Sequence, residues 1–327
     1  MPEPSPTSPK RRRGRLFRVG AAFVVLLSVA GYLVVQYVTG GAGGPGCKVV
    51  SKDGDAAAYE FTPEQAVNAA TIAAVGTGRG LPERAVTIAL ATALQESGLR
   101  NIRHGDRDSL GLFQQRPSQG WGTAKEIMDP TYAAGVFYEH LAKVPGYTDL
   151  PLTVAAQRVQ RSGYPSAYAK HEPDAVLLSA ALTGTSPATL TCDGRQSATV
   201  AAGPDAVRSA LVRDFGRDVL EPVDAEVGGS KASPSPTAAP SASGGGGRTV
   251  TLPVTADPDG ARGGGRGARQ RGWQLAHWAV ANASALHIER VAYAGREWTA
   301  GNTDSQWRTS GARTDTGTDA VRIMTAQ

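Results

Sequence analysis

PERAVTIALATALQES, residues 82–97, is the stretch that decides the fold of the first folded region. Proline at its first position suits the start of a helix, and Gly98 directly after it suits a helix end. No charged residue occurs from Ala85 to Leu94, so this helix is predicted to be buried on nearly all sides.

Four further segments carry helix start or stop signals: residues 62–76, 129–144, 150–163 and 166–184. Together with residues 82–97 they predict a mainly α domain. A turn-rich stretch, NIRHGDRDSLGLFQQRPSQGWGT, lies at residues 101–123, between the second helix and the third. A loop of this length inside a compact helical domain is usually functional.

The positive charge of the chain is concentrated at its N-terminus. Residues 1–18 hold six of the 34 basic residues and one of the 29 acidic residues, which accounts for the whole net charge of +5. The remainder therefore holds 28 residues of each sign, and this balance does not indicate the basic surface that binds nucleic acid.

An apolar segment, VGAAFVVLLSVAGYLVV, follows this tail at residues 19–35, and extension to residue 38 gives about the 20 residues that span a bilayer. The basic cluster before it predicts a cytoplasmic N-terminus by the positive-inside rule. We therefore expect a single-pass protein of the cytoplasmic membrane, with everything after about residue 40 outside. A cleaved signal peptide is the competing interpretation.

The only two cysteines, Cys47 and Cys192, both follow the apolar segment. In an oxidising compartment an isolated pair of this kind predicts a disulfide. Composition and pattern then divide the chain into seven predicted segments. These are a disordered basic cytoplasmic tail (1–18), a transmembrane signal anchor (19–38), a spacer (39–46), a mainly α domain (47–193), a helical connector (194–222), a Pro/Ser/Gly-rich linker (223–247) and a small α+β domain (248–327).

Glu96 is the charged residue at the end of the buried helix. Partial desolvation and the negative end of the helix dipole both disfavour its ionised form, so its pKa is expected to be raised. A carboxylic acid that is still protonated near neutral pH is what cleavage of a glycosidic bond requires. The alternative is an ordinary exposed glutamate at a helix end.

ALQES followed by SLGLFQ resembles the signature of the lysozyme-like lytic transglycosylases, and the whole region of about residues 58–182 is similar to such domains in actinobacterial cell-wall proteins. The resemblance assigns Glu96 as catalytic acid, Ser97 as its partner, and Gly111, Phe113 and Gln114 to the GLFQ segment. The third family element, Ala-Tyr-Asn-Ala-Gly, corresponds at best to AAQRVQRSG, which places Gln160 where asparagine is expected and valine where tyrosine is expected.

The resemblance implies cleavage of the β-1,4 bond between N-acetylmuramic acid and N-acetylglucosamine in peptidoglycan. Glu96 would first protonate the glycosidic oxygen and then act as base towards the muramoyl 6-hydroxyl, giving a 1,6-anhydro product. If Asp106 or Asp108 faced Glu96, it could instead position water and make the enzyme a hydrolase, and Asp108 is kept as a second catalytic candidate. The alternative is that both aspartates form turns or pair with Arg107.

Several side chains near these motifs could contact sugar. Trp121, which has glycine on either side, and Tyr168 are candidates for stacking on sugar rings, while Gln114, Gln115 and Gln160 could donate hydrogen bonds to N-acetyl groups. Tyr164 and Tyr138 share the aromatic character, although Tyr138 lies on an amphipathic helix and fits a core position equally well.

The C-terminal segment predicts a different kind of unit. RTVTLPV, IERVAYAG, REWTA and AVRIMTA have strand character, and WQLAHWAVANASALH is an amphipathic helix. Residues 272–301 resemble a degenerate carboxypeptidase-related domain of exported actinobacterial proteins, without its late histidine-rich motif. His277 and His287 are ten residues apart with no ligand-spaced partner, so no metal and no cofactor are expected.

The sequence thus predicts a mainly α lysozyme-like domain and a small α+β domain after a single N-terminal transmembrane helix. The predicted function is that of a membrane-anchored, extracytoplasmic peptidoglycan lytic transglycosylase or muramidase. Its partners would be peptidoglycan glycan strands, the cytoplasmic membrane and a cell-wall protein at the C-terminal domain. A non-catalytic wall-binding or scaffold protein is the alternative, and a transporter component has little support because one span makes no conduit.

Overall fold

The computed structural model describes residues 46–52, 57–161, 165–194, 203–220, 247–254, 267–301, 306–310 and 319–326. The predicted cytoplasmic tail, the transmembrane anchor and most of the Pro/Ser/Gly-rich linker lie outside these ranges. Among the described helices, none combines the length and the apolar character that crossing a membrane requires.

The described residues are about half helical and include two small antiparallel sheets, so the fold belongs to the α+β class. The helices are α2 (Pro63–Gly78), α3 (Glu83–Ser97), α4 (Ala124–Ile127), α5 (Pro130–Ala142), α6 (Leu152–Gln160), α7 (Glu172–Leu182), α8 (Gly203–Phe215), α9 (Ala268–Ala281) and α10 (Ala283–Leu286). Three-ten helices are η1 (Pro117–Gln119), η2 (Pro165–His171) and η3 (Arg217–Leu220).

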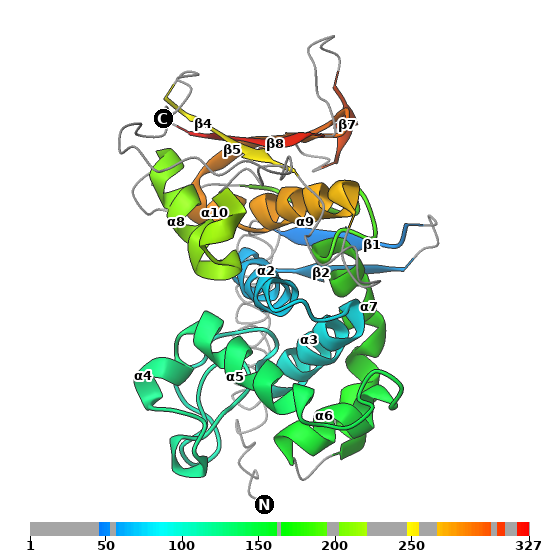
Figure 1. The fold of residues 1–327 in the computed structure, drawn as a ribbon, viewed down its shortest axis with the longest axis vertical. Coiled ribbons are helices and arrows are strands. Elements are labelled where there is room, and N and C mark those ends of the chain that lie inside the picture. Colours follow the sequence, from blue (N-terminus) through cyan, green and yellow to red (C-terminus); the bar gives the residue numbers. More distant parts are fainter. Residues whose placement is uncertain are drawn as a thin grey trace, which may run out of the picture. The chain divides into compact units, whose positions relative to one another are not determined.

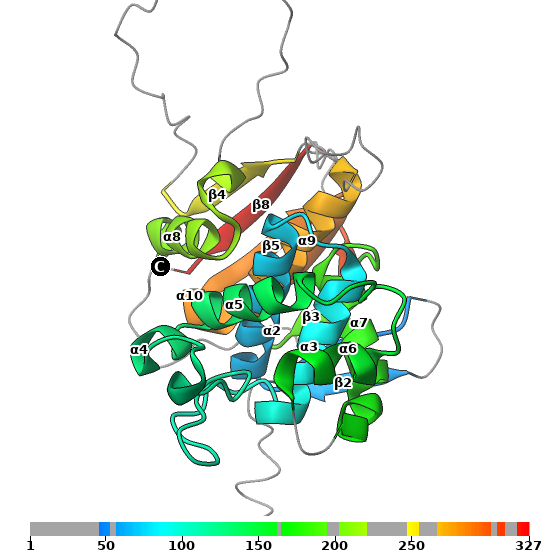
Figure 2. The same cartoon turned by 60° about the horizontal axis from the view of Figure 1, so that its bottom comes forward.

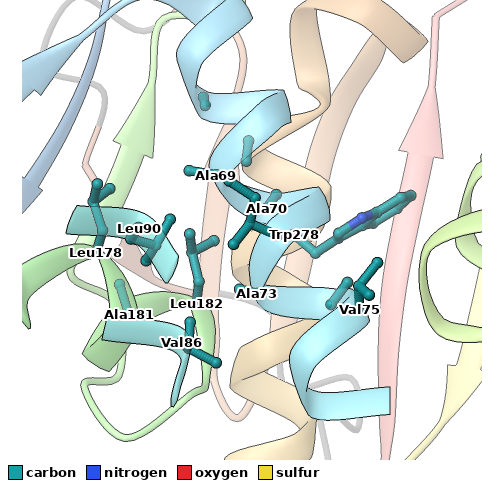
Figure 3. Packing of buried hydrophobic residues seen from close by; sticks show 14 of the residues in the cluster. Ala69, Ala70, Ala73, Val75, Val86, Leu90, Leu178, Ala181, Leu182 and Trp278 are labelled. Carbon is teal, nitrogen blue, oxygen red and sulfur yellow. The ribbon is translucent and has the colours of Figure 1, made fainter. Parts of the chain in front are cut away.

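Helix α3 has the boundaries and the burial that its sequence predicts. Pro82 precedes it, and Gly98 ends it in the left-handed conformation with φ of 62°. Every residue from Ala85 to Leu94 is buried. Val86 and Leu90 of α3 lie against Leu178 and Leu182 of α7, as Figure 3 shows.

Helix α2 lies at the centre of the molecule, with α3 and α5 on one side and α9 on another (Figures 1 and 2). A complete capping box between Thr62 and Gln65 begins it. Its alanines Ala69, Ala70 and Ala73 are buried, and Trp278 of α9 belongs to the same core, with its ring near Val75 in Figure 3. Small side chains on α2 thus allow the neighbouring helices to pack close to its backbone.

The first sheet has the strand order β2-β1-β3 and is built from β1 (Cys47–Val50), β2 (Ala58–Phe61) and β3 (Leu190–Cys192). Cys47 is the register partner of Cys192, and the two form a disulfide, which confirms the predicted pairing. The three strands were not predicted, since the sequence of this region indicates a mainly α domain.

The second sheet has the order β4-β8-β5-β6-β7, and α9 lies along one of its faces (Figure 1). Its strands are β4 (Thr249–Pro253), β5 (Ile288–Tyr293), β6 (Arg296–Thr299), β7 (Arg308–Thr309) and β8 (Ala320–Thr325). The rings of Trp273 in α9 and Tyr293 in β5 meet edge to face, with centroids 5.4 Å apart. The positions of β4, β5, β6, β8 and α9 follow the sequence prediction, whereas the two-residue strand β7 was not predicted.

The described residues from 46 to 326 form one compact unit, because α9 also packs against the helices of the first region. Asp214 of α8 is buried and accepts hydrogen bonds from the Trp278 indole at 2.8 Å and the Thr71 hydroxyl at 3.3 Å. The Gln274 amide of α9 also donates to the Thr77 hydroxyl of α2. Buried polar contacts of this kind fix α2, α8 and α9 in one arrangement.

Candidate active site

Glu96 lies in the last turn of α3 and is half-buried. Its pKa is raised because burial penalises the charged carboxylate, while hydrogen bonds from Tyr168 and Gln160 lower it in part. The Tyr168 hydroxyl donates to Oε1 of Glu96 over 2.7 Å. Burial therefore enlarges the protonated fraction of this carboxyl, and the Tyr168 hydrogen bond holds its orientation.

The three-ten helix η2 holds the end of α3. The Tyr168 hydroxyl is hydrogen-bonded to Glu96. Its ring is fully buried and therefore is not available to stack on a sugar. His171 lies three residues further on and is 3.2 Å from the side-chain oxygen of Gln95. Because a three-ten helix has three residues per turn, both side chains leave the same face of η2 and meet neighbouring residues of α3.

The Gly-Leu-Phe-Gln segment forms a tight turn. Leu110 and Gln115 are bridged by two backbone hydrogen bonds of 2.9 and 3.0 Å, which close the turn. Gly111 has φ of 74°, and a Cβ there would lie 2.7 Å from the carbonyl oxygen of Ile127. Glycine is thus required both for the backbone conformation and for this close approach.

Contacts from α3, α5 and α6 fix that turn beside Glu96. The Ser97 hydroxyl donates to the carbonyl of Leu112 over 2.8 Å, and the Gln160 amide donates to the carbonyl of Phe113 over 2.7 Å. The Phe113 ring is fully buried and stacks on Phe137 of α5, with centroids 4.6 Å apart. Ser97 and Phe113 were both predicted to bind substrate, but their side chains contact other residues of the protein.

The two glutamines after Phe113 differ in exposure. Gln114 is partly exposed and has φ of 48°, and its amide donates to the carbonyl of Gly111 over 3.2 Å. Gln115 is buried, and its amide donates to the carbonyl of Ala133 over 3.1 Å. Of the pair, Gln114 is the one that a substrate could reach, whereas Gln115 ties the loop to α5.

Asp108 is engaged within its own loop. Its Oδ1 accepts from Arg116 Nε over 2.7 Å, and its Oδ2 accepts from the backbone N–H of Ser118 over 2.9 Å. The Arg116 guanidinium, followed by the Ser118 hydrogen bonds, lowers the pKa of Asp108 well below its usual range. Asp106 is exposed, and its backbone carbonyl accepts the N–H of Ser109 in a turn. Asp106 thus forms a turn with Ser109 and has Arg107 Nε 3.9 Å from its Oδ2, whereas the partners of Asp108 are Arg116 and Ser118.

Trp121 lies between Gly120 and Gly122, which both have positive φ. Its partly buried ring stacks on His140 of α5, with centroids 4.3 Å apart, so one face of the indole is covered by the imidazole. Tyr138 is buried and donates to the carbonyl of Ile72 over 2.9 Å, which makes it a core residue. Tyr164 lies outside the described residues.

The structure therefore gathers Glu96, Tyr168, Gln160 and the turn held by Ser97 from four separate segments: α3, η2, α6 and the 110–115 loop. The contact between Tyr168 and Glu96 joins residues 72 positions apart, and no local pattern in the sequence signals it. The arrangement can donate a proton from a held carboxyl and take it back.

Comparison with known proteins bears on the other end of the chain. Residues 250–321 match the family model described as VldE, C-terminal domain. This match covers much less than half of the chain and does not include Glu96. No curated protein matches the chain significantly.

Proposed function

We propose that this protein is a membrane-anchored, extracytoplasmic enzyme that cleaves the β-1,4 bond between N-acetylmuramic acid and N-acetylglucosamine in peptidoglycan. The observation that carries the proposal is the Glu96 carboxyl, half-buried at the end of α3, with a raised pKa and a hydrogen bond from Tyr168. A raised pKa enlarges the protonated fraction near neutral pH, as a general acid needs. The resemblance of ALQES and SLGLFQ to lytic transglycosylases supplies the substrate class.

In the proposed reaction Glu96 protonates the glycosidic oxygen as the bond to the muramoyl C1 breaks. The carboxylate then accepts the proton of the muramoyl 6-hydroxyl as its oxygen attacks C1, which gives a 1,6-anhydro end. The Tyr168 hydrogen bond to Oε1 favours the acid proton on Oε2. The same hydrogen bond stabilises the carboxylate that forms after proton donation.

The engagement of Asp108 favours the transglycosylase form of this reaction. A hydrolase that positions water requires a second carboxylate facing the first. Asp108 is bound by Arg116 and by the backbone of Ser118, which gives it a structural partner for each oxygen. An internal nucleophile from the substrate needs no such second group.

A second candidate function is that of a non-catalytic wall-binding or scaffold protein with a lysozyme-like fold. The altered third family element favours it, since Gln160 and Val159 replace the expected asparagine and tyrosine. Val159 is buried, whereas Gln160 contacts both Glu96 and the 110–115 turn. The contact of Gln160 with Glu96 is the reason for preferring the enzyme.

The disulfide supports an extracytoplasmic location, because such bonds persist in oxidising compartments. The proposed anchor at residues 19–38 would hold the described region at the outer face of the cytoplasmic membrane, next to its polymer substrate. Binding of a cell-wall protein by the C-terminal segment is part of the same proposal.

The test is incubation of the full-length protein with purified peptidoglycan, followed by mass spectrometry of the soluble products. The wild type should release muropeptides with 1,6-anhydro ends, and Glu96→Gln should release none. Glu139→Gln, the same change at an exposed helix position, is the matched control and should keep full activity. Absence of release by the wild type would favour the scaffold, and reducing ends in place of anhydro ends would indicate a hydrolase.

A further inference from the structure

A hollow of about 420 Å³ lies at one end of the second sheet. Strand residues Glu289, Arg290, Thr299 and Met324 line it together with Gly194 and Gly301. None of these residues belongs to the candidate active site. Its size falls within the range of small-molecule sites, and it combines both signs of charge with a hydroxyl and a thioether.

A β-bulge brings the two charges into the hollow. Along a regular strand, successive side chains point to opposite faces of the sheet. Here the register between β5 and β8 runs from Ile288 opposite Thr325 directly to Arg290 opposite Met324, so Glu289 is the extra residue of a bulge. As a result, Glu289 and Arg290 are neighbours in sequence and yet line the same hollow. Bulges often redirect a side chain at a functional site.

Both charges keep bonding capacity for a ligand. Arg290 Nε is 3.7 Å from Glu297 Oε1, and Glu289 Oε2 is 3.8 Å from Arg248 Nη1. Hydrogen-bonded ion pairs have separations of about 2.7–2.9 Å, so these pairs attract one another without close contact. The side chains of Arg290 and Glu289 are 49% and 43% exposed, which leaves them open to solvent.

The part of the wall formed by Gly194 and Gly301 is held by the surrounding structure. Gly194 has φ of 63°, and a Cβ there would lie 2.6 Å from the Trp298 ring. The N–H of Gly301 donates to the carbonyl of Asp193 over 2.8 Å, and the Trp298 indole donates to the carbonyl of Cys192 over 3.1 Å. The disulfide and these hydrogen bonds thus fix the glycine-lined side before any ligand enters, which lowers the entropy lost on binding.

We propose that this hollow binds the zwitterionic end of an α-amino acid, with the carboxylate on Arg290 and the ammonium group on Glu289. An adjacent guanidinium and carboxylate match the two charges that an α-amino acid carries on one carbon. Two kinds of ligand have an ammonium group and a carboxylate on one carbon. One is a free amino acid, and the other is a wall peptide with a diamino-dicarboxylate residue, whose side-chain end carries the same two groups. The site does not depend on Glu96 or on cleavage of glycan.

The test measures binding of alanine to the full-length protein by isothermal titration calorimetry or by ligand-observed NMR. Alaninamide, which lacks the carboxylate, and N-acetylalanine, which lacks the ammonium group, are the paired probes. A wall tripeptide that ends in a diamino-dicarboxylate residue forms the second arm. Arg290→Gln and Glu289→Gln remove one charge each, and Arg290→Lys retains the positive charge if the glutamine variant fails to fold. Arg322→Gln is the matched control, because Arg322 is an exposed arginine of neighbouring β8 that does not line the hollow.

We expect both glutamine variants to weaken binding of alanine by about tenfold or more, as loss of a charge-assisted contact does, while Arg322→Gln leaves it unchanged. The wild type should also bind alaninamide and N-acetylalanine about tenfold more weakly than alanine. Tighter binding of the tripeptide than of alanine would identify wall peptide as the source, and the reverse would identify a free amino acid. Absence of binding by both zwitterions, equal binding of the blocked analogues, or an equal effect of Arg322→Gln would overturn the proposal.

Discussion

Removal of the Cys47–Cys192 disulfide is the perturbation whose energetic effect follows most directly from the structure. The bond closes a loop with a sequence separation of 145 residues. In the chain-entropy model a loop of that length restricts the unfolded chain by about 5 kcal/mol at 25 °C. Single domains are commonly stable by about 5–15 kcal/mol, so this bond would supply a large part of the total.

The double variant Cys47→Ala/Cys192→Ala should therefore lower the free energy of unfolding by up to about 5 kcal/mol, measured from urea unfolding curves of the full-length protein. Reduction of the wild type should reproduce most of this loss, while reductant should leave the double variant unaffected. The pairing of β1 with β3 does not itself depend on the bond, so the folded baseline should keep its circular dichroism. A loss below about 1 kcal/mol would refute the reasoning, since it would mean that the unfolded chain is already restricted without the bond.

Three further outcomes test other contacts. Tyr168→Phe removes a hydrogen bond that favours the Glu96 carboxylate, so the pKa of Glu96 should rise further. The pH above which the rate of peptidoglycan cleavage falls should then be higher than in the wild type, and an unchanged pH profile would contradict the contact. Gly111→Ala should destabilise the protein by about 1–3 kcal/mol in urea unfolding, because alanine tolerates neither the positive φ nor the nearby carbonyl, and a neutral effect would show that the turn can relax. Asp214→Ala should cost about 3 kcal/mol, since it leaves a buried indole N–H unpaired. The matched change Asp205→Ala on the same helix, at an exposed ion pair, should stay within about 1 kcal/mol, and equal losses would argue against the buried network.

Local signals explain which parts of the structure could be predicted. Helix α3 follows from its flanking Pro82 and Gly98 and from its unbroken apolar run, and these features lie within 17 residues of one another. The strands of the first sheet are only three or four residues long, which is too short for alternation to identify them, so their pairing depends on partners far along the chain. The link from Cys47 to Cys192 was predictable because composition alone leaves a single possible pair.

The candidate site was predictable in part for the same reason. Glu96 could be found because the run from Ala85 to Leu94 before it carries no charge, and burial does raise its pKa as the sequence suggested. The function of Tyr168 could not be found, because a hydroxyl that reaches Glu96 and a ring that stacks on sugar look alike in one sequence. Phe113 was expected to meet substrate, but its stacking on Phe137 depends on the packing of α5, which only the fold supplies.

The C-terminal segment has a structural consequence for the proposed enzyme. Trp278 of α9 packs into the same core as α2 and donates to buried Asp214, while the Trp298 indole of β6 donates to the carbonyl of Cys192 in the disulfide. Without residues 247–326 the part of α2 that packs against α9 would meet water, and the Asp214 carboxylate would lose a buried donor. Since α2 in turn packs against α3, support for the helix that carries Glu96 extends into the second sheet. The segment therefore contributes to the stability of the candidate active site as well as forming the separate hollow at Glu289 and Arg290.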